Sequence, residues 1–405
     1  MTSAARCAAL PLLLILSVSL PVLAQGPLIQ RFNSEQGREG INQWTSDNGK
    51  HWTEMNLPQG TETTFFLNPS TGWALITQDS VGANPGFALG STRDSGATWS
   101  VTPVKVPVNP NQFILPGQGY LQFTDEKHGW INLLVQSGSA FDVGLLLKTT
   151  NGGKSWKRVG GPGTSEEMRF INSQDGWQLG AHQRELWVTH DGSKSWQKVS
   201  LNPPANLKPV DKATYLLPVF GDQKHGAVEV AYSGLPTASE DVCHKVLYTT
   251  SDGGRHWSFS QVLSKQESCG EWWSYTAAGS VVISPGVSDG KLVLRKISLD
   301  GASPTTTVTS DSGFFVYVGS ISFSSPQEGW ASVTACCEAA CSTCSLKPSS
   351  RVSCAADENQ ERPIGRQCGA LLSTDDGGKT WTDITLRESC VLEGPTGPKH
   401  CTVQK

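Results

Sequence analysis

The sequence lacks a strong charge of either sign, and beyond its first residues it lacks long apolar runs. Its 405 residues include 32 lysines and arginines and 36 aspartates and glutamates, giving a formal net charge of −4 at pH 7. Nucleic-acid-binding domains carry a clustered basic surface, so this balance predicts no nucleic-acid partner. No segment after residue 24 has the roughly 20 apolar residues of a membrane-spanning helix. A sustained helical periodicity is also lacking, and the 42 glycines and 23 prolines favour short strands joined by tight turns.

The first 24 residues are typical of a secretory signal peptide. Arg6 precedes an apolar run from Ala8 to Leu20, and residues 22–24 provide a signal peptidase site. We therefore expect cleavage before Gln25 and a secreted or periplasmic protein whose residues 25–405 form one domain. The alternative, a membrane anchor, needs roughly 20 apolar residues, which is more than this run contains.

One short phrase recurs six times and matches the Asp-box pattern Ser/Thr-x-Asp-x-Gly-x-Ser/Thr-Trp. The first copy is Thr45-Ser-Asp47-Asn-Gly49-Lys-His-Trp52. The aspartate (or asparagine) and the tryptophan of the six copies are Asp47 and Trp52, Asp94 and Trp99, Asn151 and Trp156, Asp191 and Trp196, Asp252 and Trp257, and Asp376 and Trp381. A degenerate copy without tryptophan begins at Ser298.

A tight turn between two strands explains this phrase without a ligand. An aspartate side chain accepts hydrogen bonds from nearby backbone N–H groups and closes the turn. Glycine two residues later takes a positive φ without steric cost, and the indole covers the hairpin. We therefore expect the box aspartates to be structural. Asn151 replaces the aspartate and Ser193 replaces the glycine in two copies, but neither change abolishes a turn.

A second phrase, an apolar strand followed by a polar turn and Gly-Trp, lies upstream of most boxes. It covers Phe65 to Trp73, Leu121 to Trp130, Met168 to Trp177 and Ile321 to Trp330, with a weaker copy at Leu216 to Ala227. Each unit predicts four strands, A to D, and such units at roughly 40 to 50 residues are typical of a β-propeller. We predict an all-β propeller of four-stranded antiparallel blades, with seven blades preferred over six or eight. The first box would complete a blade with strands from one or both chain ends.

This connectivity divides the propeller into two faces. The A–B and C–D turns lie on one, the Asp-box face, and the B–C and D–A loops lie on the other, the upper face. Acidic residues are frequent in the predicted upper-face loops, and the candidate ligand-binding residues are Asp142, Glu166, Glu167, Glu240 and Asp241. Two carboxylates across a funnel can hydrolyse glycosides, but exposed loops are commonly polar. We recognise no catalytic constellation, cofactor site or metal site in the sequence.

Ten cysteines remain after Cys7 is removed with the signal peptide, and an even number favours disulfides in an exported protein. Cys243 and Cys269 are predicted in upper-face loops of one blade and form a candidate pair. The other disulfide candidates lie in the last 70 residues and are Cys336, Cys337, Cys341, Cys344, Cys354, Cys368, Cys390 and Cys401. Most of them belong to a Cys-rich insertion, about residues 335–368, in the B–C loop of the last blade.

A metal or redox site in this insertion is the alternative to disulfides. Cys341-x-x-Cys344 has the spacing of a zinc-ligand pair. Adjacent cysteines such as Cys336 and Cys337 suit tetrahedral ligation poorly, and the strand–helix setting of a thioredoxin-type motif is missing. Disulfides are therefore the expected state.

Gly-Trp at the second strand, combined with Asp-Gly-Gly-Lys-x-Trp as at Asp376 to Trp381, resembles the photosystem II stability/assembly factor family of seven-bladed propellers. It is more loosely similar to sortilin-type receptors. The likeness covers roughly residues 41–386, and the Cys-rich insertion is not part of that pattern. The resemblance implies a protein that binds a protein client without cofactor or catalysis.

The boxes also resemble those of sialidases, which use an arginine triad with a tyrosine nucleophile and an acidic partner. Arg31 and Arg38 do not sit in the Arg-Ile-Pro motif of that family, and only Arg351, Arg362 and Arg366 are placed in upper-face loops. Asp-box enzymes that cleave xyloglucan pair two propellers and need a longer chain. We therefore expect an exported, non-catalytic, monomeric binding or scaffold propeller whose upper face engages a protein or glycan partner. A glycoside hydrolase using upper-face carboxylates, or a purely structural envelope protein, is the alternative.

Overall fold

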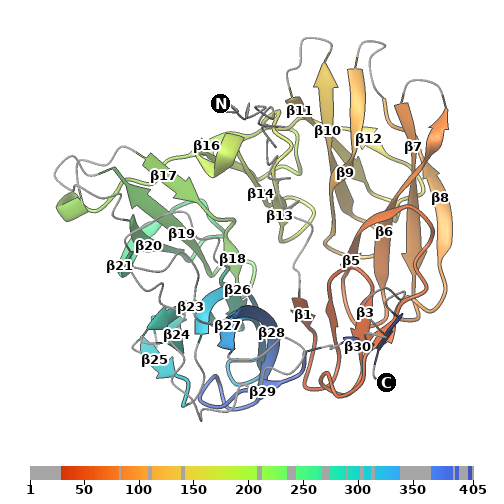
Figure 1. The fold of residues 1–405 in the computed structure, drawn as a ribbon. Coiled ribbons are helices and arrows are strands. Elements are labelled where there is room, and N and C mark those ends of the chain that lie inside the picture. Colours follow the sequence, from red (N-terminus) through yellow and green to blue (C-terminus); the bar gives the residue numbers. More distant parts are fainter. Residues whose placement is uncertain are drawn as a thin grey trace, which may run out of the picture.

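Seven antiparallel sheets arranged in a ring make up the fold (Figure 1). The computed structural model describes residues 29–81, 84–107, 112–137, 142–207, 212–234, 243–266, 274–288, 290–301, 305–311, 315–337, 366–385, 388–391 and 400–403. The predicted all-β, seven-bladed propeller is confirmed. Helix is limited in these ranges to two short 3-10 turns, η1 (Ala181–Gln183) and η2 (Ala205–Leu207). No helix among them is long and apolar enough to cross a membrane.

Each blade takes its strands consecutively from the chain. Blade 1 has β1 (Ile29–Arg31), β2 (Gly37–Glu39), β3 (Gln43–Thr45) and β4 (Thr53–Glu54); blade 2 has β5 (Thr61–Phe66), β6 (Gly72–Val81), β7 (Asn84–Thr92) and β8 (Ser100–Val104); blade 3 has β9 (Gln112–Phe123), β10 (Gly129–Ser137), β11 (Asp142–Thr149) and β12 (Lys157–Arg158); blade 4 has β13 (Met168–Phe170), β14 (Gly176–Leu179), β15 (Leu186–Thr189) and β16 (Gln197–Val199). Blade 5 has β17 (Lys212–Tyr215), β18 (Val219–Phe220), β19 (Gly226–Ser233), β20 (Cys243–Thr250) and β21 (Ser258–Gln266); blade 6 has β22 (Thr276–Ala278), β23 (Val281–Ser288), β24 (Lys291–Ser298) and β25 (Thr306–Thr309); blade 7 has β26 (Phe315–Phe323), β27 (Gly329–Cys337), β28 (Arg366–Thr374) and β29 (Thr382–Asp383). A separate two-stranded sheet, β30 (Glu388–Val391) and β31 (His400–Val403), follows.

The Gly-Trp phrase marks where neighbouring blades pack. Trp73 of blade 2 stacks on Phe123 of blade 3 with ring centroids 3.8 Å apart, and Trp130 stacks in the same way on Phe170 of blade 4. The glycine before the tryptophan leaves room for the phenylalanine of its own blade, because a Cβ at Gly129 would lie 2.6 Å from the Phe123 ring. The Phe ring is therefore held between a glycine and an indole at successive interfaces.

The continuous apolar run in β11 is covered on both of its faces. Leu145 and Leu147 belong to the core between blades 2 and 3, while Leu146 packs with Trp130 and Phe170 towards blade 4. This is the arrangement expected for stacked blades, in which no sheet face is left to solvent.

Blade 1 carries a copy of the Gly-Trp phrase that the sequence pattern did not reveal. Here the two residues are Gly37 and Arg38, and Arg38 takes the tryptophan's place with its guanidinium 5.4 Å from the Phe66 ring centroid. Its Nη1 donates to Thr64 Oγ1 at 2.7 Å, and burial lowers the pKa of Arg38 to about 10. All four strands of blade 1 come from residues 29–54, so the first box is completed by the N-terminal end alone.

The second Asp box shows the turn geometry in detail. Asp94 Oδ1 accepts the Thr98 N–H at 2.9 Å, and Thr92 Oγ1 accepts the Gly96 N–H at 3.0 Å. Gly96 has a φ of 85°, and the Trp99 indole N–H donates to the Gly96 carbonyl at 3.0 Å. The hydrogen bonds from Thr98, first of all from its hydroxyl, lower the pKa of Asp94 to about 2. The carboxylate is thus occupied by its own turn.

Ser193, the serine in the glycine position of the fourth box, connects two blades. It adopts a φ of 75°, and its hydroxyl accepts the Trp130 indole N–H of blade 3 at 3.1 Å. Trp130 is fully buried, so this bond satisfies a donor that has no access to water.

The ring closes where blade 1 meets blade 7, at a polar contact. The Arg31 side chain, fully buried, donates to the Gly329 and Thr374 carbonyls at 3.1 and 2.9 Å and pairs with the Asp375 carboxylate at 2.8 Å. Beside it, the Trp330 indole N–H donates to Asn48 Oδ1 at 2.9 Å. These bonds link segments about three hundred residues apart in the chain.

Candidate functional site

The upper face is uneven because blades 2 and 3 are built from long strands and blade 4 from short ones. β9 and β10 have 12 and 9 residues, whereas β13 and β14 have 3 and 4. Figure 1 shows β9, β10 and β11 as long arrows beside the short blade 4. The junction between blades 3 and 4 therefore forms a step, and two predicted residues, Glu166 and Glu167, lie at this step.

Two buried amides hold the backbone that leads into Glu166 and Glu167. Asn132 of β10 donates to the Thr164 and Glu166 carbonyls at 3.1 and 3.0 Å, and Gln178 of β14 donates to the same Thr164 carbonyl at 2.7 Å. The Leu179 N–H donates to the Glu167 carbonyl at 3.0 Å. The two glutamates therefore project from a segment fixed to both neighbouring blades.

The Glu166 carboxylate is committed to the loop between β14 and β15. It accepts the backbone N–H of His182 at 3.1 Å. His182 and Gln183 have φ values of 55° and 60°, a left-handed conformation that side chains other than glycine seldom adopt. Glu166 thus stabilises an unusual turn, and this loop presents His182 on the upper face.

Glu167 lies beside Arg169 and close enough to Tyr120 to interact with it. The Glu167 carboxylate is 3.8 Å from the Arg169 guanidinium. Burial raises the pKa of Glu167, and Arg169 opposes this shift. Burial, together with the charges of Glu167 and Glu166, raises the pKa of Tyr120 far above its ordinary value. Tyr120 is therefore a protonated phenol, which can donate a hydrogen bond.

A further carboxylate, Glu62 of β5, lies on the blade 2 side of β9. Its Oε1 accepts the Gly117 N–H at 2.6 Å and a hydrogen bond from the Thr77 hydroxyl. Its other oxygen is buried and has no hydrogen-bond partner among the described residues, and burial raises the pKa of Glu62. Glu62 and Tyr120 were not among the predicted site residues, although both lie in A strands, where the repeat pattern could have placed them.

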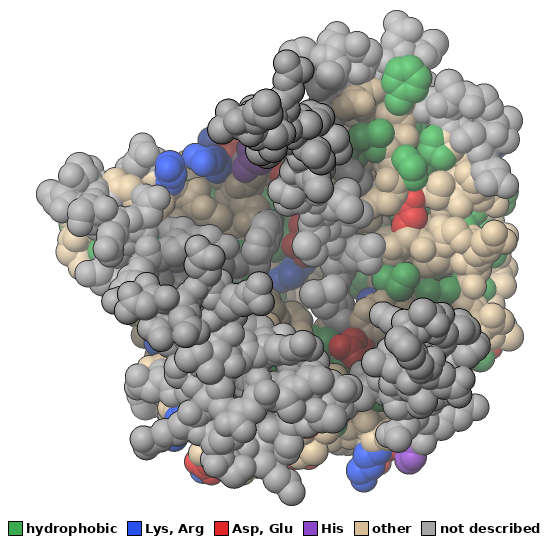
Figure 2. Space-filling model, in the orientation of Figure 1, with side chains coloured by type: hydrophobic (Ala, Val, Ile, Leu, Met, Phe, Trp, Pro, Cys, Tyr) green, Lys and Arg blue, Asp and Glu red, His purple; other side chains and the backbone are tan. Residues whose placement is uncertain are grey.

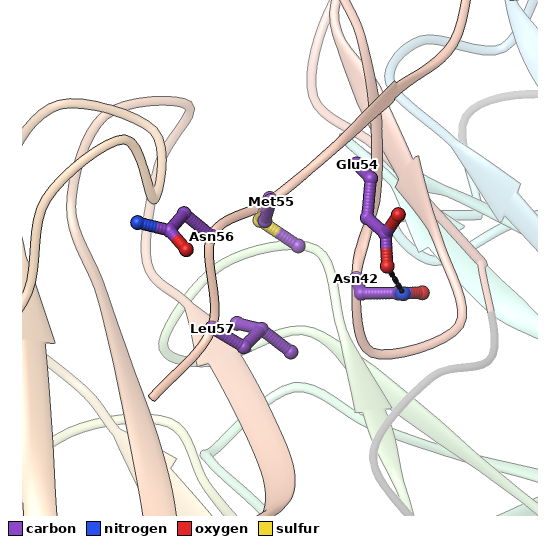
Figure 3. A pocket seen from close by; sticks show the side chains of 5 residues that line it. All are labelled: Asn42, Glu54, Met55, Asn56 and Leu57. Carbon is purple, nitrogen blue, oxygen red and sulfur yellow. Dashed lines mark hydrogen bonds between the residues drawn. The ribbon is translucent and has the colours of Figure 1, made fainter. Parts of the chain in front are cut away.

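A shallow pocket lies elsewhere on the upper face, in blade 1 and the connection to blade 2 (Figure 3). Its volume is about 360 Å³, and its lining residues are Asn42, Glu54, Met55, Asn56 and Leu57. Asn42 Nδ2 donates to Glu54 Oε1 at 3.0 Å, so these two lining side chains hydrogen-bond to each other. Amide and carboxylate groups of this kind can bind hydroxyl groups of a small polar ligand.

The centre of the ring carries both signs of charge. Figure 2 shows acidic and basic side chains in the middle of the view, between the flanking blades. Within the described part of the chain, no group of three or more histidine, cysteine, aspartate or glutamate side chains is arranged to hold a metal ion.

Other predicted residues fall wholly or partly outside the described ranges. Asp142 is described only through its backbone, which pairs with Gln136, and Glu240 and Asp241 lie outside. Cys243 is fully buried at the start of β20, while its predicted partner Cys269 lies outside, so this pairing stays a prediction. β27 ends at Cys337 and β28 begins at Arg366, so most of the predicted Cys-rich insertion, with Cys341, Cys344 and Cys354, also lies outside.

Comparison with known proteins gives only distant structural neighbours. No family model matches the chain, and no curated protein matches it by sequence. Among solved structures, YCF48 from Cyanidioschyzon merolae is 16% identical over 80% of this chain and 86% of its own, with a TM-score of 0.42. The BP39L lectin from Burkholderia pseudomallei is 12% identical over 89% of this chain and 99% of its own, with a TM-score of 0.48. The GH74 xyloglucanase from Xanthomonas campestris is 11% identical over 93% of this chain and 69% of its own, with a TM-score of 0.46. At these identities and scores, none of them carries an argument about ligand or reaction.

Proposed function

We propose that this protein is an exported, non-catalytic binding propeller that engages a protein or glycan partner through its upper face. The contact region is the step between blades 3 and 4. The observation that carries the proposal is that the described carboxylates there already have protein partners. Glu166 accepts the His182 N–H, and Glu167 lies 3.8 Å from the Arg169 guanidinium. A rigid, bonded surface suits recognition, because little conformational entropy is lost on binding.

Tyr120 adds a hydrogen-bond donor to this surface. Burial and the charges of Glu167 and Glu166 raise its pKa, so the phenol keeps its proton at neutral pH. A protonated phenol, an imidazole and carboxylates are groups that hydrogen-bond the hydroxyls and amides of a glycan or a peptide.

A glycoside hydrolase is the second candidate, and one observation favours it. Burial raises the pKa of both Glu62 and Glu167, on opposite sides of β9. A general acid in glycoside hydrolysis needs such a raised pKa. In this alternative, Glu62 and Glu167 would serve as the carboxylate pair.

The family assignment is part of the proposal. The Asp-box hydrogen bonds and the Gly-Trp packing support a propeller of the assembly-factor type, which implies a protein client. Export through residues 1–24 would place that client in the envelope or outside the cell.

The test is a crosslinking capture from envelope extract together with a glycan array, using residues 25–405. The site variant is Tyr120→Phe combined with Glu167→Gln, and the matched control is Lys379→Ala, an exposed residue on the Asp-box face. We expect one partner to be captured by the parent chain and by the control but weakly by the site variant. Equal capture by all three proteins would reject the blade 3–4 surface as the contact.

The hydrolase alternative has its own readout. Release of reducing ends from a polysaccharide panel that is abolished in both Glu62→Gln and Glu167→Gln would replace the binding proposal with catalysis. Binding of a glycan without turnover would support the proposal as stated.

A further inference from the structure

The connection between β14 and β15 on the upper face is a compact turn with two strained residues. Its ends are joined, because the Gly180 N–H donates to the Glu185 carbonyl at 2.7 Å, and the Gln183 N–H donates to the Gly180 carbonyl at 2.9 Å. His182 and Gln183 have φ values of 55° and 60°, and Glu166 holds this backbone by accepting the His182 N–H at 3.1 Å. Strain of this kind persists at functional sites, where the surrounding structure imposes it.

The exposed side chains on this turn and beside it are hydrogen-bond donors, and two of them are cationic. His182 and Arg184 are exposed, as is Lys212 at the start of β17, a strand that lies against η1. Within the described part of the chain, neither Arg184 nor Lys212 forms an ion pair. Figure 2 shows basic side chains over β16 and β17, with a histidine and an acidic side chain beside them. This surface therefore offers cations without protein partners to an anionic ligand.

The carboxylate of Glu185, at the end of the turn, orients an indole. Its two oxygens accept hydrogen bonds from the Lys198 ammonium at 2.7 Å and from the Trp187 indole N–H at 3.0 Å. Trp187 is only partly buried, so part of its ring is accessible. Tryptophan is frequent at binding surfaces because its rigid ring gives a large contact area. An oriented, accessible indole of this kind can pack against the ring of a sugar.

We propose that the turn at residues 180–185 is a recognition element of the upper face and binds an acidic polysaccharide. Carboxylate or sulfate groups of the polymer pair with Arg184 and Lys212. His182 donates a hydrogen bond, and Trp187 packs on a sugar ring. Glu166 is a positioning residue, since it holds the backbone from which His182 projects. The inference rests on the proposed function, because it names the class of partner for the same face.

The test measures binding of the exported full chain to four polymers: polygalacturonate, which carries carboxylates, dextran sulfate, neutral dextran and polyglutamate. We expect saturable binding to polygalacturonate or dextran sulfate that weakens with added salt, and none to dextran. The acidic polysaccharide that binds identifies the group recognised. Arg184→Gln should weaken binding about fivefold, the equivalent of one exposed ion pair. Lys379→Ala, on the Asp-box face, should leave binding unchanged.

Glycine variants separate recognition from folding. His182→Gly removes the imidazole and relaxes the left-handed backbone, so binding should weaken while Tm does not fall. Ser95→Gly is the matched control, because Ser95 has a φ of 61° in an Asp-box turn, and this variant should leave binding unchanged. Glu166→Ala should weaken binding, whereas Glu166→Gln, which keeps an acceptor oxygen, should restore it.

Three results would overturn the proposal: binding to neither acidic polysaccharide, undiminished binding by both Arg184→Gln and His182→Gly, or binding to polyglutamate alone. The last would indicate an acidic protein segment instead of a glycan. A fall in Tm for His182→Gly would overturn the claim that the turn is strained. If the proposal fails while capture of a partner still depends on Tyr120 and Glu167, the proposed function stands and only this inference is lost.

Discussion

Replacing Arg31 with alanine should destabilise the whole propeller, because this side chain closes the ring. Its fully buried guanidinium bonds to two carbonyls, a hydroxyl and a carboxylate of blade 7, the last at 2.8 Å from Asp375. Individual hydrogen bonds to charged groups contribute about 1.5–3 kcal/mol, but part of that sum is offset by the cost of desolvating the guanidinium. Without Arg31 the buried Gly329 and Thr374 carbonyls each lose a donor, at about 1–3 kcal/mol per group, so we expect a destabilisation of about 3–5 kcal/mol.

Thermal and guanidinium unfolding followed by tryptophan fluorescence measure this effect. Trp52 and Trp330 report on the interface, since their ring centroids are 5.7 Å apart across it. With about 2.1 cal/mol/K of unfolding entropy per residue, a chain of this size should lose roughly 4–6 °C in Tm.

The matched control is Asp375→Asn, whose side chain is 68% exposed. An exposed partner contributes little, so this variant should change the unfolding free energy by less than about 1 kcal/mol. Arg31→Lys keeps the charge without the planar fork and should fall between the two. An Arg31→Ala protein within about 1 kcal/mol of the parent would refute the argument, and ring closure would then rest on apolar packing alone.

Three further outcomes are expected. Ser193→Ala should cost about 1–3 kcal/mol in denaturant unfolding, because the buried Trp130 indole N–H loses its acceptor; an unchanged midpoint would contradict this. Gly129→Ala should cost about 1–3 kcal/mol, since its Cβ would overlap the Phe123 ring; a neutral result would show that the ring can shift. The pKa of Asp94 is lowered to about 2 from an ordinary 3.8. The contribution of this carboxylate to the unfolding free energy is therefore complete above about pH 4 and is lost as the pH falls towards 2. When Tm is measured at a series of pH values, Asp94→Asn should therefore reduce the fall in Tm between about pH 4 and pH 2. An unchanged fall in Tm would contradict the lowered pKa.

The architecture was predictable because it is repeated. Six boxes and the Gly-Trp phrases each imply the same four strands. Misreading one copy therefore does not change the predicted fold. Blade 1 escaped full prediction because Arg31 and Arg38 occupy positions that are phenylalanine and tryptophan in blades 2, 3, 4 and 7. A cation in an apolar position hides the pattern, although the guanidinium plane packs over an aromatic ring as an indole does.

The site was less predictable because it depends on irregularities between blades. In the β9–β10 ladder, Leu133 pairs with Gly119 and Val135 with Ile114, so β9 bulges by several residues at Gly117. This bulge brings the Gly117 N–H within hydrogen-bonding distance of Glu62. The sequence periodicity does not specify that contact between β9 and β5. Glu166 was predicted as an upper-face residue from the repeat alone, but its bond to His182 depends on a left-handed turn that no local pattern signalled.

The two faces differ for a physical reason that also limits where recognition can evolve. On the Asp-box face the aspartate or asparagine at the box position bonds within its own turn: Asp94 accepts from Thr98, and Asn151 accepts from Ser155. A substitution there breaks a hairpin before it alters a surface. On the upper face, the backbone from Thr164 to Glu167 is held by amides that belong to the blades, Asn132 and Gln178, and the Thr164 hydroxyl and the Glu166 carboxylate add bonds of their own. A side chain that makes no such bond can change here without loss of the fold, which supports a partner contact on the upper face.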